Sequence, residues 1–335
     1  MIGALLLLAA LGGAAEPSAA WVPIADGASA WVEHLPGDGP VVVLCHGISS
    51  NHRFWDLDEA HSFARWLQAR GYDVWNMDLR GHGPARRDEA GHRQRAGWTI
   101  DDYGQGDLPA VFAYVRAETG AAKLNFVAHS LGGMAFAAYL AQEPEPPIAS
   151  AVIVASPLDF RDPDRVTGLA LRGARVASVA PFVPTPLGGR VAARLQHLPL
   201  RLDERLSAPG RMTPTSRRAM YRTVVSPMSS GELRQLGLAA RAGDFTSADG
   251  AVTYREALGQ VQVPMLFLAG RADHVASPDR VWGYFDAVGS PDKRFAVIGE
   301  AEGASGDYGH IDFALAEHAA ADVFPLITAW IQEHP

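Results

Sequence analysis

Hydrophobic and polar positions along this chain predict strands and helices in alternation. Short apolar runs rich in β-branched residues predict buried strands at VVVLC (41–45), KLNFVA (123–128), IASAVIVASP (148–157) and VPMLFLAG (263–270). Segments with apolar residues at helical spacing lie between them, as in FWDLDEAHSFARWLQARG (54–71) and LGGMAFAAYLAQ (131–142). This alternation favours an α/β fold with a mostly parallel central sheet covered by helices on both faces.

Two segments depart from the simple alternation. Before VVVLC, a strand and the turn PGDG predict a hairpin that enters the central sheet. From residue 158 to 250, strand-like runs are few and prolines and arginines are frequent. We therefore expect a helical cap or lid at 158–250, inserted between the two parts of one core at 21–157 and 251–335.

The motif AHSLGG places Ser130 at the junction between a predicted strand and a predicted helix. A sharp turn at such a junction exposes the hydroxyl above the helix N-terminus, as in the nucleophile elbow G-x-S-x-G. Ala128 stands where that pattern has its first glycine, which adds one methyl group. The alternative for Ser130 is a serine that caps the following helix.

A nucleophilic serine needs a base and an acid, and the loops after later strands offer both. GRADHVASP places Asp273 just beyond one strand, and YGHIDF places His310 in the last loop before the final helix. The order Ser130, Asp273, His310 is the order of nucleophile, acid and base on folds of this kind. We predict that these three residues form the catalytic triad.

Other residues compete for these roles. Asp159, after the strand at 148–157, is the alternative acid, whereas Asp307 is expected to shape the loop of the predicted base. His274 lies too close to the predicted acid in sequence to receive the serine proton. His129 is expected on the wrong side of the turn to act as the base.

An oxyanion hole is expected from two backbone N–H groups. The first is that of Leu131, which follows the nucleophile, and the second is that of Ile48, in the loop HGISSNH after VVVLC. Gly47 lets the backbone approach a substrate closely; the alternative is that it only serves a turn. We expect His46, Gly47 and His129 to contribute to substrate binding.

Several motifs together resemble the α/β-hydrolase superfamily: HG after a strand, DLRGHG, AHSLGG, GRADHVASP and YGHIDF. The resemblance covers about 41–155 and 263 to the end. DLRGHG and GHIDF are similar to segments of the acid-lipase and monoacylglycerol-lipase-like branches. The resemblance implies hydrolysis of carboxylic esters, including lipid esters, with no cofactor. The same triad also serves acyltransferases and polyester synthases or depolymerases, and a non-catalytic binding module remains a further alternative.

The composition disfavours several other classes of protein. The 335 residues are 48% hydrophobic and 20% charged, with a formal net charge of −8, which disfavours a general nucleic-acid binder. Cys45 is the single cysteine, so no intrachain disulfide forms, and its apolar surroundings predict a buried side chain. No His and carboxylate cluster has the spacing of metal ligands, and we expect no metal.

Two features concern membranes and export. Residues 1–20 are apolar, then small, and predict a signal peptide and an exported protein, although no Lys or Arg precedes Arg53. A cytoplasmic protein is expected if the segment is not a signal. The predicted cap carries arginines among apolar residues, which favours either a solvated helix face or contact with an anionic lipid surface. These are Arg161, Arg165, Arg172, Arg175, Arg190, Arg194, Arg201 and Arg205.

Overall fold

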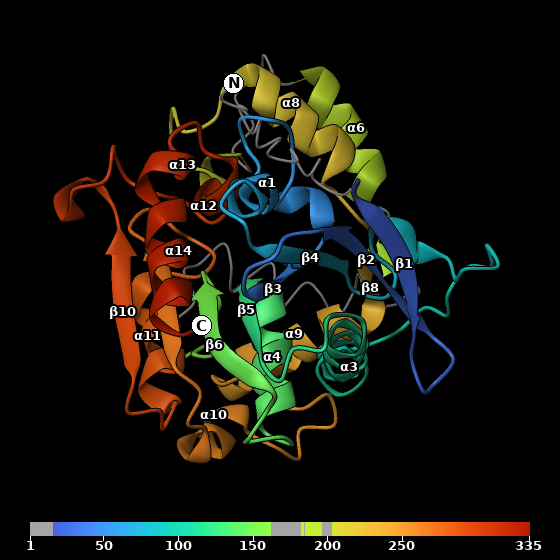
Figure 1. Ribbon diagram of the computed structural model, residues 1–335. Helices are drawn as coiled ribbons and strands as arrows, with labels where there is room; N and C mark the ends of the chain where they lie inside the picture. Colours follow the sequence, from blue (N-terminus) through green and yellow to red (C-terminus); the bar gives the residue numbers. More distant parts are fainter. Residues whose placement is uncertain (1–15, 162–181, 184, 196–202) are drawn as a thin grey trace, which may run out of the picture.

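The computed structural model describes residues 16–161, 182–183, 185–195 and 203–335. Its centre is an eight-stranded sheet with the spatial order β1-β2-β4-β3-β5-β6-β9-β10 (Figure 1). Both β1 with β2 and β2 with β4 are antiparallel, and the strands from β4 to β10 in that order are parallel. The strands are β1 (Ser18–Pro23), β2 (Ser29–Leu35), β3 (Val41–Cys45), β4 (Asp73–Asp78), β5 (Leu124–His129), β6 (Ile148–Val154), β9 (Met265–Gly270) and β10 (Lys293–Ile298).

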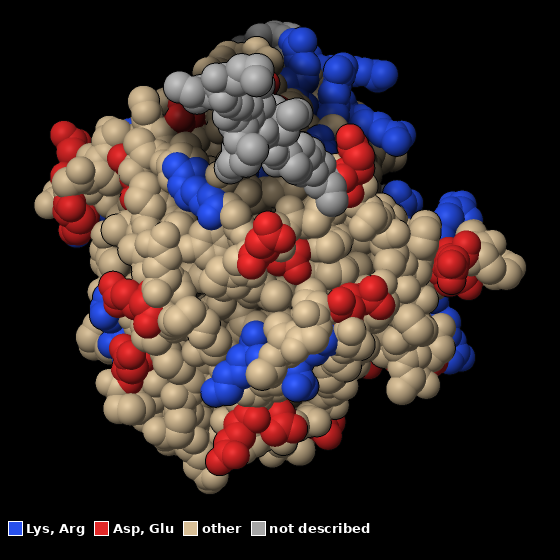
Figure 2. Space-filling view, in the orientation of Figure 1, with Lys and Arg blue, Asp and Glu red and all other residues tan. Residues whose placement is uncertain are grey.

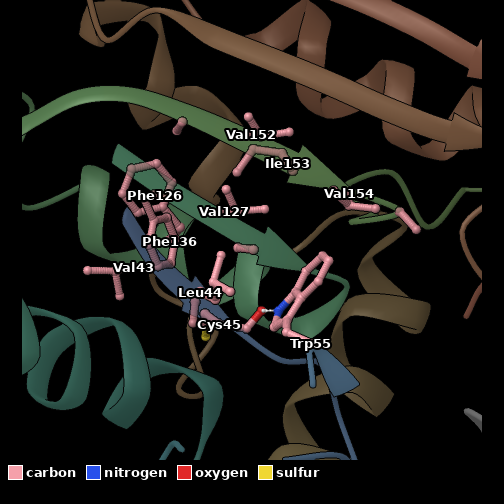
Figure 3. Packing of buried hydrophobic residues seen from close by; sticks show 14 of the residues in the cluster. Val43, Leu44, Cys45, Trp55, Phe126, Val127, Phe136, Val152, Ile153 and Val154 are labelled. Carbon is pink, nitrogen blue, oxygen red and sulfur yellow. Dashed lines mark hydrogen bonds between the residues drawn. The ribbon is translucent and has the colours of Figure 1, made fainter. Parts of the chain in front are cut away.

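The apolar runs of the sequence form the middle of this sheet. Strand β3 is buried along its whole length, because helices cover both faces of the sheet there (Figure 3). Trp55 packs at the end of β3, and its indole N–H donates a hydrogen bond of 3.0 Å to the carbonyl oxygen of Cys45. The Cys45 side chain is fully buried, as predicted, and burial raises the pKa of its thiol.

Helices cover the two faces of the sheet. On one face α1 packs against α14, where the rings of Phe63 and Phe324 lie 4.8 Å apart. On the other face α4 contacts α3, and the Tyr284 hydroxyl of α11 donates to the Gly133 carbonyl of α4 at 3.1 Å. The predicted α/β fold with a mostly parallel, helix-covered sheet is confirmed. These helices are α1 (Phe63–Gln68), α3 (Leu108–Thr119), α4 (Leu131–Leu140), α11 (Pro278–Ala287) and α14 (Phe324–Glu333).

Short helices complete the core, and all of them are shorter than two full turns. They lie mostly in the connections between the elements above. They are η1 (His52–Phe54), η2 (Gly83–Arg86), α2 (Ile100–Asp102), η3 (Tyr103–Asp107), α10 (Tyr254–Ala257), η4 (Leu258–Gln260), η5 (Glu300–Glu302), α12 (Asp312–Leu315) and α13 (Ala319–Asp322).

The predicted hairpin before VVVLC is wrong, because β4 lies between β2 and β3 and pairs with both. The PGDG segment instead crosses close to the backbone that leads into β4. A Cβ added at Gly37 would lie 2.2 Å from the Tyr72 carbonyl oxygen, and one at Gly39 would lie 2.6 Å from that of Gly71. These glycines therefore permit a close backbone crossing, which leaves the same sequence signature as a tight turn.

The predicted cap region is largely helical where it is described. Its elements are β7 (Phe182–Val183), α6 (Thr185–Leu195), α7 (Asp203–Leu206), α8 (Pro214–Thr223), β8 (Met228–Ser229) and α9 (Ser230–Ala242). Helices α6 and α8 lie side by side, beyond the carboxyl ends of β6 and β10 (Figure 1). Arg165, Arg172, Arg175 and Arg201 lie outside the described residues. The division at 158 and 250 therefore stays a prediction.

The predicted leader at 1–20 is described only from residue 16 onward. Ser18, Ala19 and Ala20 belong to β1, where they pair with β2. Within the described ranges, none of the helices is both long enough and apolar enough to cross a bilayer.

Candidate active site

Ser130 occupies the sharp turn between β5 and α4. Its backbone has a φ of 51° and a ψ of −116°, which non-glycine residues adopt only when their surroundings hold them there. The Ser130 N–H donates to the Val154 carbonyl oxygen of β6 at 2.8 Å and holds the turn against the neighbouring strand. The Ser130 side chain makes no capping hydrogen bond to α4, which disfavours the helix-cap alternative.

The two glycines after Ser130 are needed for packing. A Cβ on Gly132 would lie 2.6 Å from the carbonyl oxygen of His46, and one on Gly133 would lie 2.2 Å from the Oγ of Ser156. Ala128 precedes the turn as a regular residue of β5 and is fully buried, with no positive φ. The added methyl group at the first elbow position is therefore accommodated as ordinary strand packing.

The three predicted catalytic side chains lie in one hydrogen-bonded chain. His310 Nε2 is 2.9 Å from the Oγ of Ser130, and His310 Nδ1 is 2.8 Å from the Oδ2 of Asp273. The backbone N–H groups of Val275 and Ala276 donate to the other carboxylate oxygen at 2.7 and 2.8 Å. A serine O–H that donates to Nε2 leaves the imidazole proton on Nδ1, facing the carboxylate.

The fold brings these loops together at the carboxyl edge of the sheet. Asp273 follows β9 and His310 follows the neighbouring strand β10, and the Ala272 N–H donates to the Tyr308 carbonyl oxygen at 2.9 Å. Because the strands are adjacent and parallel, their following loops start at the same edge. This adjacency explains how residues far apart in sequence meet next to Ser130.

The competing residues lie elsewhere. The carboxylate of Asp159 forms ion pairs with Arg161 and with Arg255, at 3.4 Å for the second pair. Asp307 accepts a hydrogen bond from the Glu300 N–H at 3.0 Å, which shapes the loop as expected. His274 is exposed, unlike the buried Asp273 beside it.

Two backbone N–H groups near Ser130 have no hydrogen-bond partner among the described residues, those of Ile48 and Leu131. Leu131 is 1% exposed, and a buried N–H group is rarely left unpaired in a folded protein. Gly47 lies against the nucleophile, since an added Cβ would be 3.0 Å from the Cβ of Ser130. Gly47, which precedes one of the two residues, lies against Ser130, and the role of both N–H groups as oxyanion donors stays a prediction.

His46 faces the protein interior rather than a substrate. Its side chain is fully buried; Nε2 accepts the Leu79 N–H at 3.2 Å, and Nδ1 donates to the Gly47 carbonyl oxygen at 2.8 Å. Burial and the neighbouring His82 lower the pKa of His46 to about 3, so the ring is neutral. The ring therefore orients the peptide between Gly47 and Ile48, and a contribution of His46 to substrate binding stays a prediction.

His129 lies beside His310, with ring centroids 4.8 Å apart. Its ring stacks on Phe54 with centroids 4.3 Å apart, and its Nε2 donates to the His310 carbonyl oxygen at 2.8 Å. Burial and the neighbouring His310 hold the pKa of His129 well below its usual value. Its Nδ1 is buried without a partner among the described residues and lies near Gly47. His129 thus supports the loop of the predicted base.

Sequence reasoning assigned no role to a buried network around DLRGHG. His82 Nδ1 donates to the Ser50 carbonyl oxygen at 2.7 Å, and its Nε2 lies 3.3 Å from Glu232 of α9, which also bonds the Tyr103 hydroxyl. Burial opposes a charge on His82, but the hydrogen bond and the charge of Glu232 outweigh it and raise the pKa of His82. The closely spaced charged residues and glycines of DLRGHG were the only feature of the sequence that could have pointed to this network.

Metal binding has no candidate site in the ranges that the structure describes, because no group of three or more His, Cys, Asp or Glu side chains is arranged to hold an ion.

A family model described as alpha/beta hydrolase fold matches residues 40–315. The chain belongs to the α/β-hydrolase fold family. Among curated proteins, this α/β hydrolase is 33% identical over 100 residues to human lipase member N and, over the same length, to human gastric triacylglycerol lipase. Each match covers 29% of this chain, and the chain spans about a quarter of each lipase, 25%.

Solved structures resemble the α/β hydrolase over nearly its whole length. An esterase from Thermogutta terrifontis matches with a TM-score of 0.63 and 17% identity, covering 95% of this chain and all of that chain, 100%. A monoacylglycerol lipase from Paleococcus ferrophilus matches with a TM-score of 0.59 and 18% identity, covering 96% of this chain and 100% of that one. At these identities the likeness concerns the fold.

Proposed function

We propose that this α/β hydrolase cleaves carboxylic esters through a covalent acyl-enzyme. The observation that carries the proposal is the hydrogen-bonded chain from Ser130 through His310 to Asp273. Its geometry suits a nucleophile whose proton is taken by a base that an acid orients. The short lipase matches and the fold likeness to esterases support the same reaction class.

In the first half-reaction, His310 Nε2 takes the Ser130 proton while the serine Oγ attacks the ester carbonyl carbon. The carbonyl π-electrons move to oxygen, and the N–H groups of Ile48 and Leu131 bind the resulting oxyanion. When the tetrahedral intermediate collapses, the bond to the alkoxy group breaks and the imidazolium gives its proton to the departing alcohol. Asp273 holds the imidazole tautomer and stabilises the imidazolium.

In the second half-reaction, water replaces the alcohol. The same imidazole takes a proton from water as its oxygen attacks the acyl carbon, and the same two N–H groups bind the second oxyanion. Collapse breaks the bond between the acyl carbon and the serine oxygen, which regains its proton and releases the acid. We propose that Gly47, which lies against the serine, contacts the acyl group, and that His129 contributes to substrate binding by supporting the loops of Gly47 and His310.

Labelling with a fluorophosphonate tests the nucleophile, since this reagent reacts with a serine that a neighbouring base activates. We expect labelling at Ser130 in the folded wild type, and none in Ser130→Ala or in heat-denatured protein. A folded wild type that takes no label would favour a non-catalytic binding module. Lipid esters are the proposed substrate class, and a panel of p-nitrophenyl esters of increasing chain length measures the acyl preference.

Hydrolysis and acyl transfer differ only in the acceptor that attacks the acyl-enzyme. Analysis of the products from a short-chain ester, with and without an added alcohol, separates them. We expect free acid as the main product in both cases. A new ester as the main product when alcohol is present would assign the protein to acyl transfer.

We further propose that the α6 and α8 pair contacts an anionic lipid surface. Neither helix contains an acidic residue, although the whole chain has a net charge of −8. Two apolar side chains of α6, Leu187 and Val191, are 64% and 47% exposed. Basic side chains gather over these helices at the upper right of Figure 2, and the exposed ones are Arg190, Arg194, Arg218 and Arg222.

Vesicle sedimentation tests this surface. We expect binding to vesicles with anionic lipid that weakens with salt, and little binding to neutral vesicles. The double variant Arg190→Glu, Arg194→Glu should lose this binding. A matched double variant, Arg86→Glu with Arg93→Glu, reverses two exposed arginines outside these helices and should retain it. Equal binding of the wild type to both kinds of vesicle would refute the contact and leave a solvated helix face.

Export is also proposed, from the apolar segment at 1–20. Cleavage after Ala20 would remove the first half of β1, because that strand begins at Ser18. Mass spectrometry of the mature protein from its native host would locate the cleavage. An uncleaved N-terminus in the cytoplasmic fraction would contradict the proposal.

A further inference from the structure

The loop Ile48–Asn51, which carries one proposed oxyanion donor, is fastened to the cap at Ser49. The Ser226 N–H donates to the Ser49 carbonyl oxygen at 3.0 Å, and the Ser49 hydroxyl donates to the Ser226 carbonyl oxygen at 2.9 Å. Ser49 has a φ of 53°, a left-handed conformation that a serine keeps only when its neighbours hold it. The reciprocal pair of bonds to Ser226 supplies that restraint.

The Ser226 hydroxyl also bonds two other residues outside the cap, Asn51 and Gly83. Its Oγ accepts hydrogen bonds from the Asn51 side-chain amide at 3.1 Å and from the Gly83 N–H at 3.2 Å. The same Asn51 amide donates to the Thr223 carbonyl oxygen, at the end of α8, at 2.9 Å. Ser226 is 2% exposed, so water does not replace these bonds readily.

The two sides of the proposed oxyanion donor are therefore held by different parts of the chain. Before Ile48, the core holds the backbone, because His46 Nδ1 donates to the Gly47 carbonyl oxygen at 2.8 Å. After Ile48, the backbone of Ser226 holds Ser49, because its N–H bonds the Ser49 carbonyl oxygen and its carbonyl oxygen accepts the Ser49 hydroxyl. The direction of the Ile48 N–H depends on both restraints. The N–H lies in one peptide plane with the Gly47 carbonyl, and the Ile48 carbonyl lies in the next plane with the Ser49 N–H.

We propose that Ser226, a cap residue, is a positioning residue for the oxyanion hole. This inference rests on the proposed ester hydrolysis and adds a dependence of catalysis on the docked Thr223–Ser226 segment. The oxyanion donors are aligned only while this segment is bound to the loop at Ser49. Displacement of the segment releases the left-handed residue and turns the Ile48 N–H away from the developing charge.

The experiment compares Ser226→Ala with the wild type on a p-nitrophenyl ester and on its thionoester, in which sulfur replaces the carbonyl oxygen. The alanine keeps the backbone groups that bond Ser49 but removes the hydroxyl that holds the segment to Asn51 and Gly83. An oxyanion hole shaped for oxygen stabilises a thiolate less, so a misaligned hole loses more rate on the ester than on the thionoester. We expect kcat on the ester to fall about tenfold, less than the ~10²–10³ that follows loss of a whole donor. The KM should stay within about twofold, and the ratio of ester to thionoester rates should fall with kcat.

Two further variants separate positioning from cap stability. Asn51→Asp removes the amide donor to Ser226 and Thr223 but keeps the oxygen that accepts the Arg53 N–H at 2.9 Å. It should lower the same rate ratio, and it serves as the test if Ser226→Ala does not fold. Thr213→Ala removes the N-cap of α8, whose hydroxyl accepts the Ser216 N–H at 3.1 Å, without touching the loop. Thr213→Ala should leave the rate ratio unchanged.

The outcomes are distinct. Equal loss on the ester and the thionoester in folded Ser226→Ala, or the same ratio change in Thr213→Ala, would overturn the positioning role. Wild-type rates in Ser226→Ala would also overturn it. Absence of both ester hydrolysis and fluorophosphonate labelling in the wild type would instead overturn the proposed function itself.

Discussion

Replacing Asp273 by asparagine tests the orientation of the proposed base. The backbone N–H groups of Val275 and Ala276 donate to one carboxylate oxygen of Asp273. In Asp273→Asn, the amide oxygen must keep that position, because an NH₂ group there would face these two N–H donors and leave both without an acceptor. At about 1–3 kcal/mol for each unsatisfied group, the flipped amide is disfavoured by about 2–6 kcal/mol.

The asparagine NH₂ group therefore faces His310 Nδ1, which sits 2.8 Å from the native carboxylate oxygen. Nδ1 must then accept a hydrogen bond, so the imidazole proton moves to Nε2. That nitrogen lies 2.9 Å from the Ser130 hydroxyl and can no longer take its proton. We expect kcat to fall ~10⁴-fold, the typical effect of a wrong histidine tautomer, with little change in KM.

The assay is hydrolysis of a p-nitrophenyl ester, with circular dichroism to show that each variant is folded. Asp307→Asn is the matched control, because Asp307 bonds the Glu300 N–H in the loop of His310. Asp159→Asn tests the alternative acid. Both controls should stay within about twofold of the wild type. A folded Asp273→Asn within tenfold of wild-type kcat, or an equal loss in Asp159→Asn, would refute the assigned acid.

Three further predictions concern residues next to the proposed site. Gly47→Ala should lower kcat at least ~10²-fold in stopped-flow or steady-state assays, since its Cβ would lie 2.8 Å from His129 and 3.0 Å from Ser130; wild-type rates would contradict the close approach. Ala128→Gly restores the usual elbow residue. It should lower the free energy of unfolding in urea by about 0.5–1 kcal/mol without raising kcat, because Ala128 is a regular strand residue. A gain in kcat would show that the methyl group hinders the turn. His46 has a folded pKa of about 3 against 6.5 for an ordinary histidine, so the unfolded chain binds its proton first and stability falls as pH drops from 6.5 toward 3. At about 1.4 kcal/mol per pKa unit this loss approaches 5 kcal/mol at pH 3, and urea unfolding of His46→Asn should show a shallower pH dependence than the wild type; equal slopes would contradict a neutral buried ring.

The residues of the proposed triad could be named from the sequence because each motif follows a predicted strand at the carboxyl edge of a parallel sheet, where functional loops lie. Ser130 follows one predicted strand, Asp273 follows another, and His310 precedes the last helix. Their order along the chain is the order of nucleophile, acid and base in α/β hydrolases. The sequence does not reveal that both ring nitrogens of His46 bond the backbone.

The cap contacts were not predictable in the same way. Ser226 lies in VVSPMSS, which has no motif, and its partners Ser49 and Asn51 are more than a hundred positions away. The pairing of Glu232 with His82 likewise joins segments separated by 150 positions. Such bonds depend on where a helix is docked, and no local pattern encodes that.

The amino-acid sequence by itself determined the alternation of strands and helices and the residues at the ends of the strands, because burial and turn chemistry are local properties. It also determined Cys45 as a buried, unpaired residue. Only the tertiary structure decided that β4 separates β2 from β3, which way His46 faces, and how Ser226 reaches the loop after β3. These are relations between distant segments, fixed by packing and by the hydrogen bonds that buried polar groups need.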